Sequence, residues 1–141
     1  MRRLSMKTAL LFATLATVST PAWAAAPIEG RYVTENGRAV VAVKTCGKAM
    51  CGKVDKILRP KKGVPARDIN NDDPALRSRP ILGLPILMGL TADDDVWRGD
   101  IYNPEDGNEY RAVVSRMANG SLKVQGCLAF ICKTQVWKPA S

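Results

Sequence analysis

Four cysteines form two copies of one spacing, Cys46-x4-Cys51 and Cys127-x4-Cys132. An even number of cysteines in a small domain is typical of disulfides in an oxidising compartment. Three pairings are possible. We favour Cys46 with Cys51 and Cys127 with Cys132, because a four-residue turn can place both ends of each motif on adjacent strands. A zinc site with four cysteine ligands is the alternative, but structural zinc pairs are usually more closely spaced and belong to reducing compartments. We therefore expect disulfides, with no metal and no other cofactor.

The chain contains no histidine, which removes the Ser-His-Asp and Cys-His nucleophile systems and the imidazole metal ligands. Redox catalysis by the cysteines is also disfavoured, because the thioredoxin-type spacing is C-x2-C. Many classes of enzyme are excluded by these two observations.

A cluster of oxygen-bearing side chains partly matches a calcium loop. Asp68, Asn70 and Asp72 occupy the first three ligand positions of the EF-hand pattern. The rest of the pattern fails, because Asp73 stands at the position of the tight-turn glycine and Arg79 at that of the bidentate glutamate. The sequence therefore does not predict a calcium site.

We instead expect the same residues to hold a loop in place. Asp68, Asn70 and Asn71 are predicted to hydrogen-bond nearby backbone amides. Arg77 and Arg79 follow closely, and a guanidinium can form bidentate bonds to a carboxylate such as Asp68. We prefer this internal pairing to the binding of an external anion.

Two groups of carboxylates near expected strand ends could in principle act as an acid/base pair. They are Asp93 to Asp95, and Asp106 with Glu105 and Glu109. Solvated turns contain such residues routinely, and nothing in the sequence indicates a pocket or a raised pKa for any of them. We therefore predict a protein without enzymatic activity.

The first 24 residues have the order of a secretory signal peptide. Arg2 and Arg3 open a basic start, residues 9–18 are apolar except for two threonines, and Ala22-Trp23-Ala24 supplies an A-x-A ending. The apolar run is shorter than the roughly 20 residues that a bilayer-spanning helix needs. We expect cleavage near Ala24, a periplasmic mature protein and no transmembrane segment after cleavage.

Length and charge indicate one domain with a basic excess. Of the 141 residues, 46% are hydrophobic and 24% charged, as in a globular domain. Cleavage leaves residues 25–141 as a single barrel domain and lowers the net charge from +8 to +5, because it removes three basic and no acidic residues. Six basic side chains gather between Lys53 and Arg67, which could favour an anionic lipid surface. Nucleic acid is not an expected partner, because no aromatic residues interleave with these cations.

After Pro27, short runs rich in valine, isoleucine and aromatic residues alternate with turn signals, and no window has helical periodicity. This pattern predicts an all-β protein. Asn36-Gly37 is a strong hairpin signal, and later turn residues continue the series as an antiparallel meander. The expected strands cover residues 31–34, 39–45, 52–58, 96–102, 110–116, 122–127 and 132–137.

The segment from Arg59 to Leu90 interrupts the meander, and we expect it to form one long ordered connection. Residues 67–74 have polar turn chemistry, and residues 75–78 could form one helical turn. Pro85 lacks the N–H that a central strand needs, so residues 86–88 are predicted to be at most a short edge strand.

Seven or eight strands joined by consecutive hairpins favour a closed barrel of about eight strands over a two-sheet sandwich, which usually needs long crossovers. The interior of such a barrel is either filled by its own side chains or holds one small ligand. Alternation along the strands gives six candidate lining residues on the apolar face: Trp97, Tyr110, Val114, Leu122, Val124 and Trp137.

Several motifs are shared with a known family. They include Gly30-Arg-Tyr32, Asp68-Ile-Asn-Asn-Asp-Asp-Pro74, Leu76-Arg-Ser-Arg-Pro80, Leu122-Lys-Val-Gln-Gly126 and Thr134-Gln-Val-Trp137. On these motifs the chain resembles the bacterial exported domain-of-unknown-function 2147 family along nearly the whole mature length. The resemblance implies a lipocalin-like (calycin) barrel and no established catalytic residues.

Two departures from the family pattern concern the closure of the barrel. Tyr32 stands where the family more often has tryptophan, and Lys138 follows Trp137 in place of arginine. In lipocalin-like barrels an N-terminal Gly-x-Trp packs against a late arginine, so the resemblance implies a contact between these two positions.

Two functional hypotheses follow. The first is a periplasmic, non-enzymatic barrel that binds a small, partly apolar ligand among the six candidate lining residues. The alternative is a cell-envelope interaction protein with a side-chain-filled barrel, which contacts a protein or anionic lipid through the 59–90 connection. Salt discriminates between them, because binding through surface lysines weakens with ionic strength whereas binding in an apolar cavity changes little.

Overall fold

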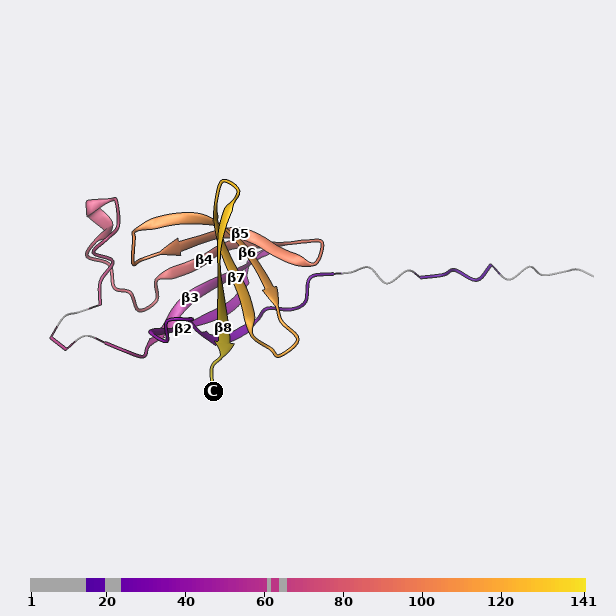
Figure 1. Ribbon diagram of the computed structural model, residues 1–141, viewed down its shortest axis with the longest axis horizontal. Coiled ribbons are helices and arrows are strands. Elements are labelled where there is room, and N and C mark those ends of the chain that lie inside the picture. The colour runs from indigo at the N-terminus through magenta and orange to yellow at the C-terminus, as the bar shows by residue number, and fades with distance from the viewer. Residues whose placement is uncertain (1–14, 20–23, 61, 64–65) are drawn as a thin grey trace, which may run out of the picture.

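Eight antiparallel strands close into one barrel, in which each strand pairs with its neighbour in sequence and the first pairs with the last (Figure 1). The computed structural model describes residues 15–19, 24–60, 62–63 and 66–141. Most of the predicted signal peptide, residues 1–14 and 20–23, lies outside the described residues. The prediction of an all-β, eight-stranded antiparallel meander is confirmed. The strands are β1 (Gly30–Val33), β2 (Ala39–Cys46), β3 (Ala49–Ile57), β4 (Pro85–Asp93), β5 (Val96–Asn103), β6 (Asn108–Arg116), β7 (Leu122–Leu128) and β8 (Ile131–Pro139).

β4 is a full strand of nine residues between β3 and β5, so the prediction of at most a short edge strand over residues 86–88 is wrong. Pro85 is the first residue of β4, a position where proline is tolerated within a sheet. Closure of the barrel also leaves no edge at which such a strand could lie. The long connection therefore covers residues 58–84 rather than 59–90, and its described part includes a short 3-10 helix at Pro74–Leu76.

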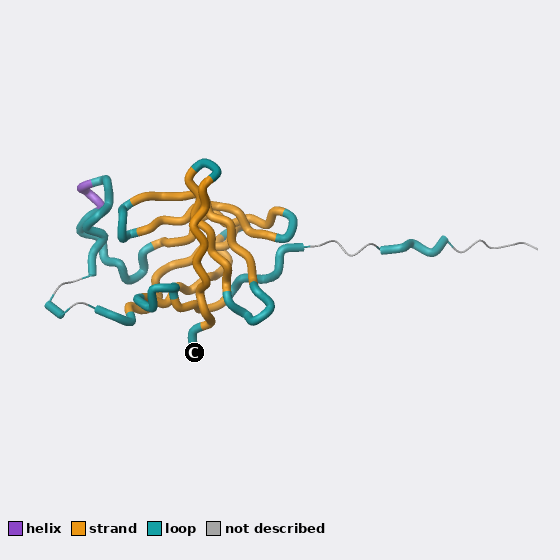
Figure 2. Tube along the Cα trace, viewed as in Figure 1, coloured by secondary structure: helices purple, strands orange, loops and turns teal. Residues whose placement is uncertain are grey.

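The antiparallel order divides the loops between the two ends of the barrel. We call one end the mouth; its described residues are 34–38, 58–60, 62–63, 66–84, 104–107 and 129–130. Figure 2 shows the connection and the β5–β6 turn together on one side, with the β4–β5 turn on the opposite side. The β7–β8 hairpin extends beyond its neighbouring strands.

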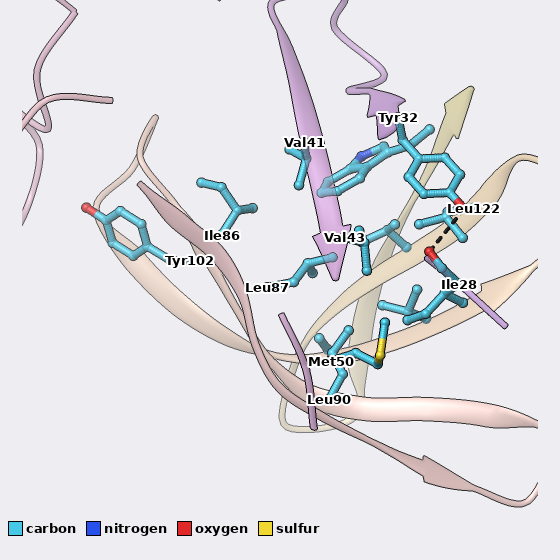
Figure 3. Close-up of a cluster of buried hydrophobic side chains, with 14 of the residues drawn as sticks. Ile28, Tyr32, Val41, Val43, Met50, Ile86, Leu87, Leu90, Tyr102 and Leu122 are labelled. Carbon is cyan, nitrogen blue, oxygen red and sulfur yellow. Dashed lines mark hydrogen bonds between the residues drawn. The ribbon is translucent and has the colours of Figure 1, made fainter. Parts of the chain in front are cut away.

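The buried core runs along the barrel interior toward the end opposite the mouth. Figure 3 shows Ile86 and Tyr102 on one side of this cluster and Ile28, Tyr32 and Leu122 on the other. Strand alternation directs these side chains inward, since residues i and i+2 share a face. These packed apolar side chains close the barrel interior at the end away from the mouth.

Tyr32 closes the end opposite the mouth, with an arginine that the resemblance does not anticipate. The Tyr32 hydroxyl donates to Ile28 O at 3.0 Å, and Arg116 Nη1 donates to the same hydroxyl at 3.3 Å. Lys138 is instead exposed and pairs in register with Val33. The guanidinium therefore comes from the end of β6 and not from the position after Trp137.

Both favoured disulfides are present, and the described residues contain no free cysteine. Cys46–Cys51 ties the end of β2 to β3. Cys127–Cys132 joins two residues directly opposite each other on β7 and β8, with Cα atoms 4.0 Å apart. Each bond therefore closes a hairpin that the strand register already defines.

Candidate ligand-binding cavity

A cavity of about 660 Å³ lies inside the mouth of the barrel. Its volume falls within the range of small-molecule sites, about 300–1,000 Å³. Its inner wall consists of buried or partly buried apolar side chains contributed by six strands. They are Val41, Val54, Ile86, Ile101, Val124 and Trp137.

Of the six lining residues predicted from sequence, three lie near the mouth and line the cavity, and the other three lie nearer the opposite end of the barrel. Tyr110, Val124 and Trp137 line the cavity. Val114 and Leu122 lie on the same inner face but nearer the opposite end, and both are fully buried in the core. They support the floor and do not line the cavity.

Trp97 lies still farther from the mouth, near the start of β5. Its ring packs against the core, and its Nε1 donates to Ala26 O at 2.9 Å, a hydrogen bond that ties the N-terminal segment to the barrel. This tryptophan therefore has a structural position outside the cavity.

Sequence reasoning missed the contribution of the first half of the barrel. Val54 alternates with Lys53 and Asp55 along β3, so the period-two pattern could have identified it, whereas Val41 follows the buried Val40 and no clean alternation marks it. Ile86 was hidden because its segment was interpreted as part of the connection. Its place in the cavity depends on β4 being a central strand.

A buried polar cluster joins the connection to the barrel wall. Asp68 is fully buried, and its carboxylate accepts hydrogen bonds from three side chains: Tyr102 Oη at 2.5 Å, Arg79 Nε at 2.8 Å and Asn71 Nδ2 at 2.9 Å. The Arg79 guanidinium also lies 5.3 Å from the centroid of the Tyr102 ring, within the range of a cation–π contact. A buried carboxylate with this many donors is stable in its charged form.

The same contacts set the ionisation of the cluster. Burial acts to raise the pKa of Asp68, but hydrogen bonds from Tyr102, Asn71 and Arg79 outweigh it and hold that pKa below its usual range. Burial and the hydrogen bond to Asp68 raise the pKa of Tyr102. At neutral pH the cluster is thus an ionised carboxylate, a charged guanidinium and a neutral phenol.

The predicted roles of the loop residues hold in part. The internal pairing of Arg79 with Asp68 is observed, whereas Arg77 Nε donates to the backbone carbonyl of Asn71 at 2.7 Å. The Asp68 carboxylate was expected to accept hydrogen bonds from nearby backbone amides but accepts them from side chains instead, and one of these, Tyr102, lies 34 residues away in sequence. Asn70 Nδ2 donates across to Pro104 O and Glu105 O, both at 3.1 Å, and so links the connection to the β5–β6 turn.

Gly107 permits the close approach of these two loops. Its φ is +76°, and a Cβ built on it would lie 1.8 Å from Asn70 O. No side chain fits there without displacing the backbone of the connection. The connection is thus fixed over one side of the mouth by Asp68, Asn70 and the absence of a side chain at Gly107.

The two carboxylate groups considered as an acid/base pair lie at opposite ends of β5. Asp93 pairs with Arg98 at 2.7 Å, and Glu105 pairs with Arg38 at 3.3 Å. Asp106 accepts from the Tyr110 hydroxyl at 2.6 Å, and this hydrogen bond lowers the pKa of Asp106 against the effect of burial. Across the described ranges there is no group of three or more His, Cys, Asp or Glu side chains that could hold a metal ion.

The fold and cavity together define a lipocalin-like barrel with a hollow mouth. Residues 30–139 match the model of the family described as uncharacterized protein conserved in bacteria (DUF2147), and the chain belongs to this family. The recognition made from the shared motifs is therefore confirmed.

A solved structure has the same fold. Protein HP1028 from Helicobacter pylori, which is described as belonging to the lipocalin family, is 23% identical and aligns with a TM-score of 0.70 over 82% of this chain and 84% of that one. A search of curated proteins found no significant match. Among the described residues, no helix is long and apolar enough to cross a membrane.

Proposed function

We propose that this protein is a periplasmic, non-enzymatic barrel that binds a small, partly apolar molecule in the cavity at its mouth. The cavity of about 660 Å³ with its apolar inner wall carries the proposal. Burying an apolar ligand against such a wall is favourable by about 25 cal/mol per Å² of apolar surface removed from water. The lipocalin-family neighbour supports the same class of function by its fold.

Two observations support export to the periplasm. The leader has the order of a signal peptide, and the two disulfides suit an oxidising compartment. In this proposal, cleavage near Ala24 leaves residues 25–141 as a single domain. No catalytic role is proposed, because the carboxylates of the mouth are paired with neighbours or hydrogen-bonded in turns.

The experiment is native mass spectrometry of the protein purified from an exporting host, with a cavity-filling variant beside it. Gly126 lines the cavity, and a Cβ on it would make only ordinary contacts, 3.5 Å from Ile101 Cγ2. We expect the wild type to carry a non-covalent adduct that survives a high-salt wash, and Gly126→Leu to lose it. Gln125→Leu, on the opposite face of β7, is the matched control and keeps the adduct. Equal retention by all three proteins, or a protein without adduct that also fails to bind alkyl probes, would contradict the proposal.

The alternative hypothesis is a docking protein whose barrel is filled by its own side chains. The structure does not fit the filled barrel, because it has a cavity at the mouth. Its docking surface still has an observation in its favour. Ile69 and Leu82 of the connection are 66% and 56% exposed, so both apolar side chains are accessible to a partner. A partner bound there through the neighbouring cations would dissociate with rising salt, whereas a ligand whose apolar part is buried in the cavity would be displaced less.

A further inference from the structure

The lining of the cavity changes from apolar to positively charged toward the mouth. Along β8 the inward-facing positions are Trp137, Gln135 and Lys133, which are buried, half-buried and exposed in that order. All three line the cavity, so its wall along β8 changes from a buried apolar side chain to an exposed cation. A ligand that matches this wall has an apolar end toward Trp137 and a polar end toward Lys133.

Basic side chains outnumber acidic ones in the lining of the cavity. The lining includes four basic side chains, Arg38, Arg59, Arg67 and Lys133, and only two acidic ones, Glu105 and Asp106. Both carboxylates already have partners, since Glu105 pairs with Arg38 at 3.3 Å and Asp106 accepts from Tyr110.

The other three cations have no carboxylate oxygen within 4.0 Å among the described residues. Two of them are positioned by the fold. Arg67 Nη1 donates to Ser78 O at 2.5 Å, and the Arg59 guanidinium lies over the β1–β2 turn at Gly37. We use the term rim cations for Arg59, Arg67 and Lys133.

We propose that the ligand is an amphiphile with an anionic head, carboxylate or phosphate, whose apolar part enters the barrel and whose head lies among the rim cations. Guanidinium and ammonium groups form charge-assisted hydrogen bonds with such heads. A neutral hydroxyl head forms weaker hydrogen bonds with them than an anion does, and a cationic head is repelled. This inference rests on the proposed function, because it assigns the ligand class of the same cavity.

The test measures binding of twelve-carbon probes by quenching of tryptophan fluorescence, since Trp137 lies in the cavity. Dodecanoate and dodecyl phosphate carry the two anionic heads, and dodecanol and dodecylamine carry neutral and cationic ones. We expect the anionic probes to bind about tenfold more tightly than dodecanol, since each exposed ion pair strengthens binding by at most about fivefold and three cations are available. Whichever of the two anionic probes binds more tightly shows whether the site prefers a carboxylate or a phosphate head.

Variants locate the head. Arg59→Met, Arg67→Met and Lys133→Met should each weaken dodecanoate binding by about two- to fivefold and leave dodecanol unchanged. Lys123→Met removes an exposed cation from the outer face of β7 and is the matched control, with no expected effect.

The outcomes separate this inference from the proposed function. If dodecanol binds as tightly as dodecanoate, or if the rim variants weaken both probes equally, the cavity binds apolar molecules but the anionic head is wrong. If no probe binds and the purified protein carries no adduct, the proposed function itself fails.

Discussion

The Asp68 carboxylate accepts a hydrogen bond at 2.5 Å from the Tyr102 hydroxyl, which stands 34 residues later in the chain. One residue belongs to the long connection and the other to the end of β5, so this contact joins the loop that covers part of the mouth to the wall of the barrel. Because Asp68 is fully buried, the contact cannot be replaced by water without opening the connection.

Asp68→Asn should destabilise the protein by about 2 kcal/mol at pH 7, since it removes the charge of a buried pair. The pKa of Asp68 is lowered in the folded state from 3.8, so its contribution is present above the unfolded pKa and is lost as the pH falls through the folded pKa. Urea unfolding at pH 7 and pH 3 should therefore show a gap between wild type and variant that narrows in acid. Asp72→Asn, an exposed neighbour, is the control, and a gap of equal size at both pH values would contradict the role of the charge.

Gly107→Ala should destabilise the protein by about 3 kcal/mol, because the new Cβ meets Asn70 O in addition to requiring a positive φ. Gly83→Ala is the matched control, since its φ is +83° and nothing lies within 4 Å of the added Cβ. Its cost should be about 1 kcal/mol from backbone strain alone. Equal losses in thermal unfolding of the two variants would mean that the connection is not packed against the β5–β6 turn.

Tyr32 and Arg116 should be energetically coupled at the closed end of the barrel. Arg116 Nη1 lies 3.3 Å from both the Tyr32 hydroxyl and Pro27 O. Tyr32→Phe is expected to cost about 1 kcal/mol, and the double variant with Arg116→Met less than the sum of the two single changes. The same cycle with Lys138→Met in place of Arg116→Met should be additive, and coupling to Lys138 instead would restore the contact that the resemblance implies.

Each disulfide should contribute about 2 kcal/mol, because each closes a short loop in the unfolded chain. Replacing Cys46 and Cys51 together by alanine, or Cys127 and Cys132 together, should lower the urea midpoint by similar amounts. Reducing agent should lower the midpoint of the wild type and have a smaller effect on either variant. An unchanged midpoint in a double variant would show that the strand register alone holds that hairpin.

Features that depend on neighbouring residues could be predicted from the sequence. Asn36-Gly37 specifies a hairpin locally, as its turn chemistry requires, and the C-x4-C spacing places its cysteines on paired strands. The alternation along β7 likewise placed Val124 on the inner face, because a period of two is a property of the strand itself.

Closure of the barrel decided the rest. Whether Pro85 begins a central strand depends on β3 and β5 being on either side of it, and the place of Ile86 in the cavity follows from that. The contact of Asp68 with Tyr102 and that of Tyr32 with Arg116 join distant parts of the chain, so no local pattern specifies them, whereas the pairing of Asp68 with Arg79 could be predicted from the sequence. The sequence by itself determined seven of the eight strands and their turns and favoured the disulfide pairing that is observed, because these arise from short-range geometry. Only the tertiary structure decided the cavity and its charged rim, because both are made by side chains that meet when the eight strands close.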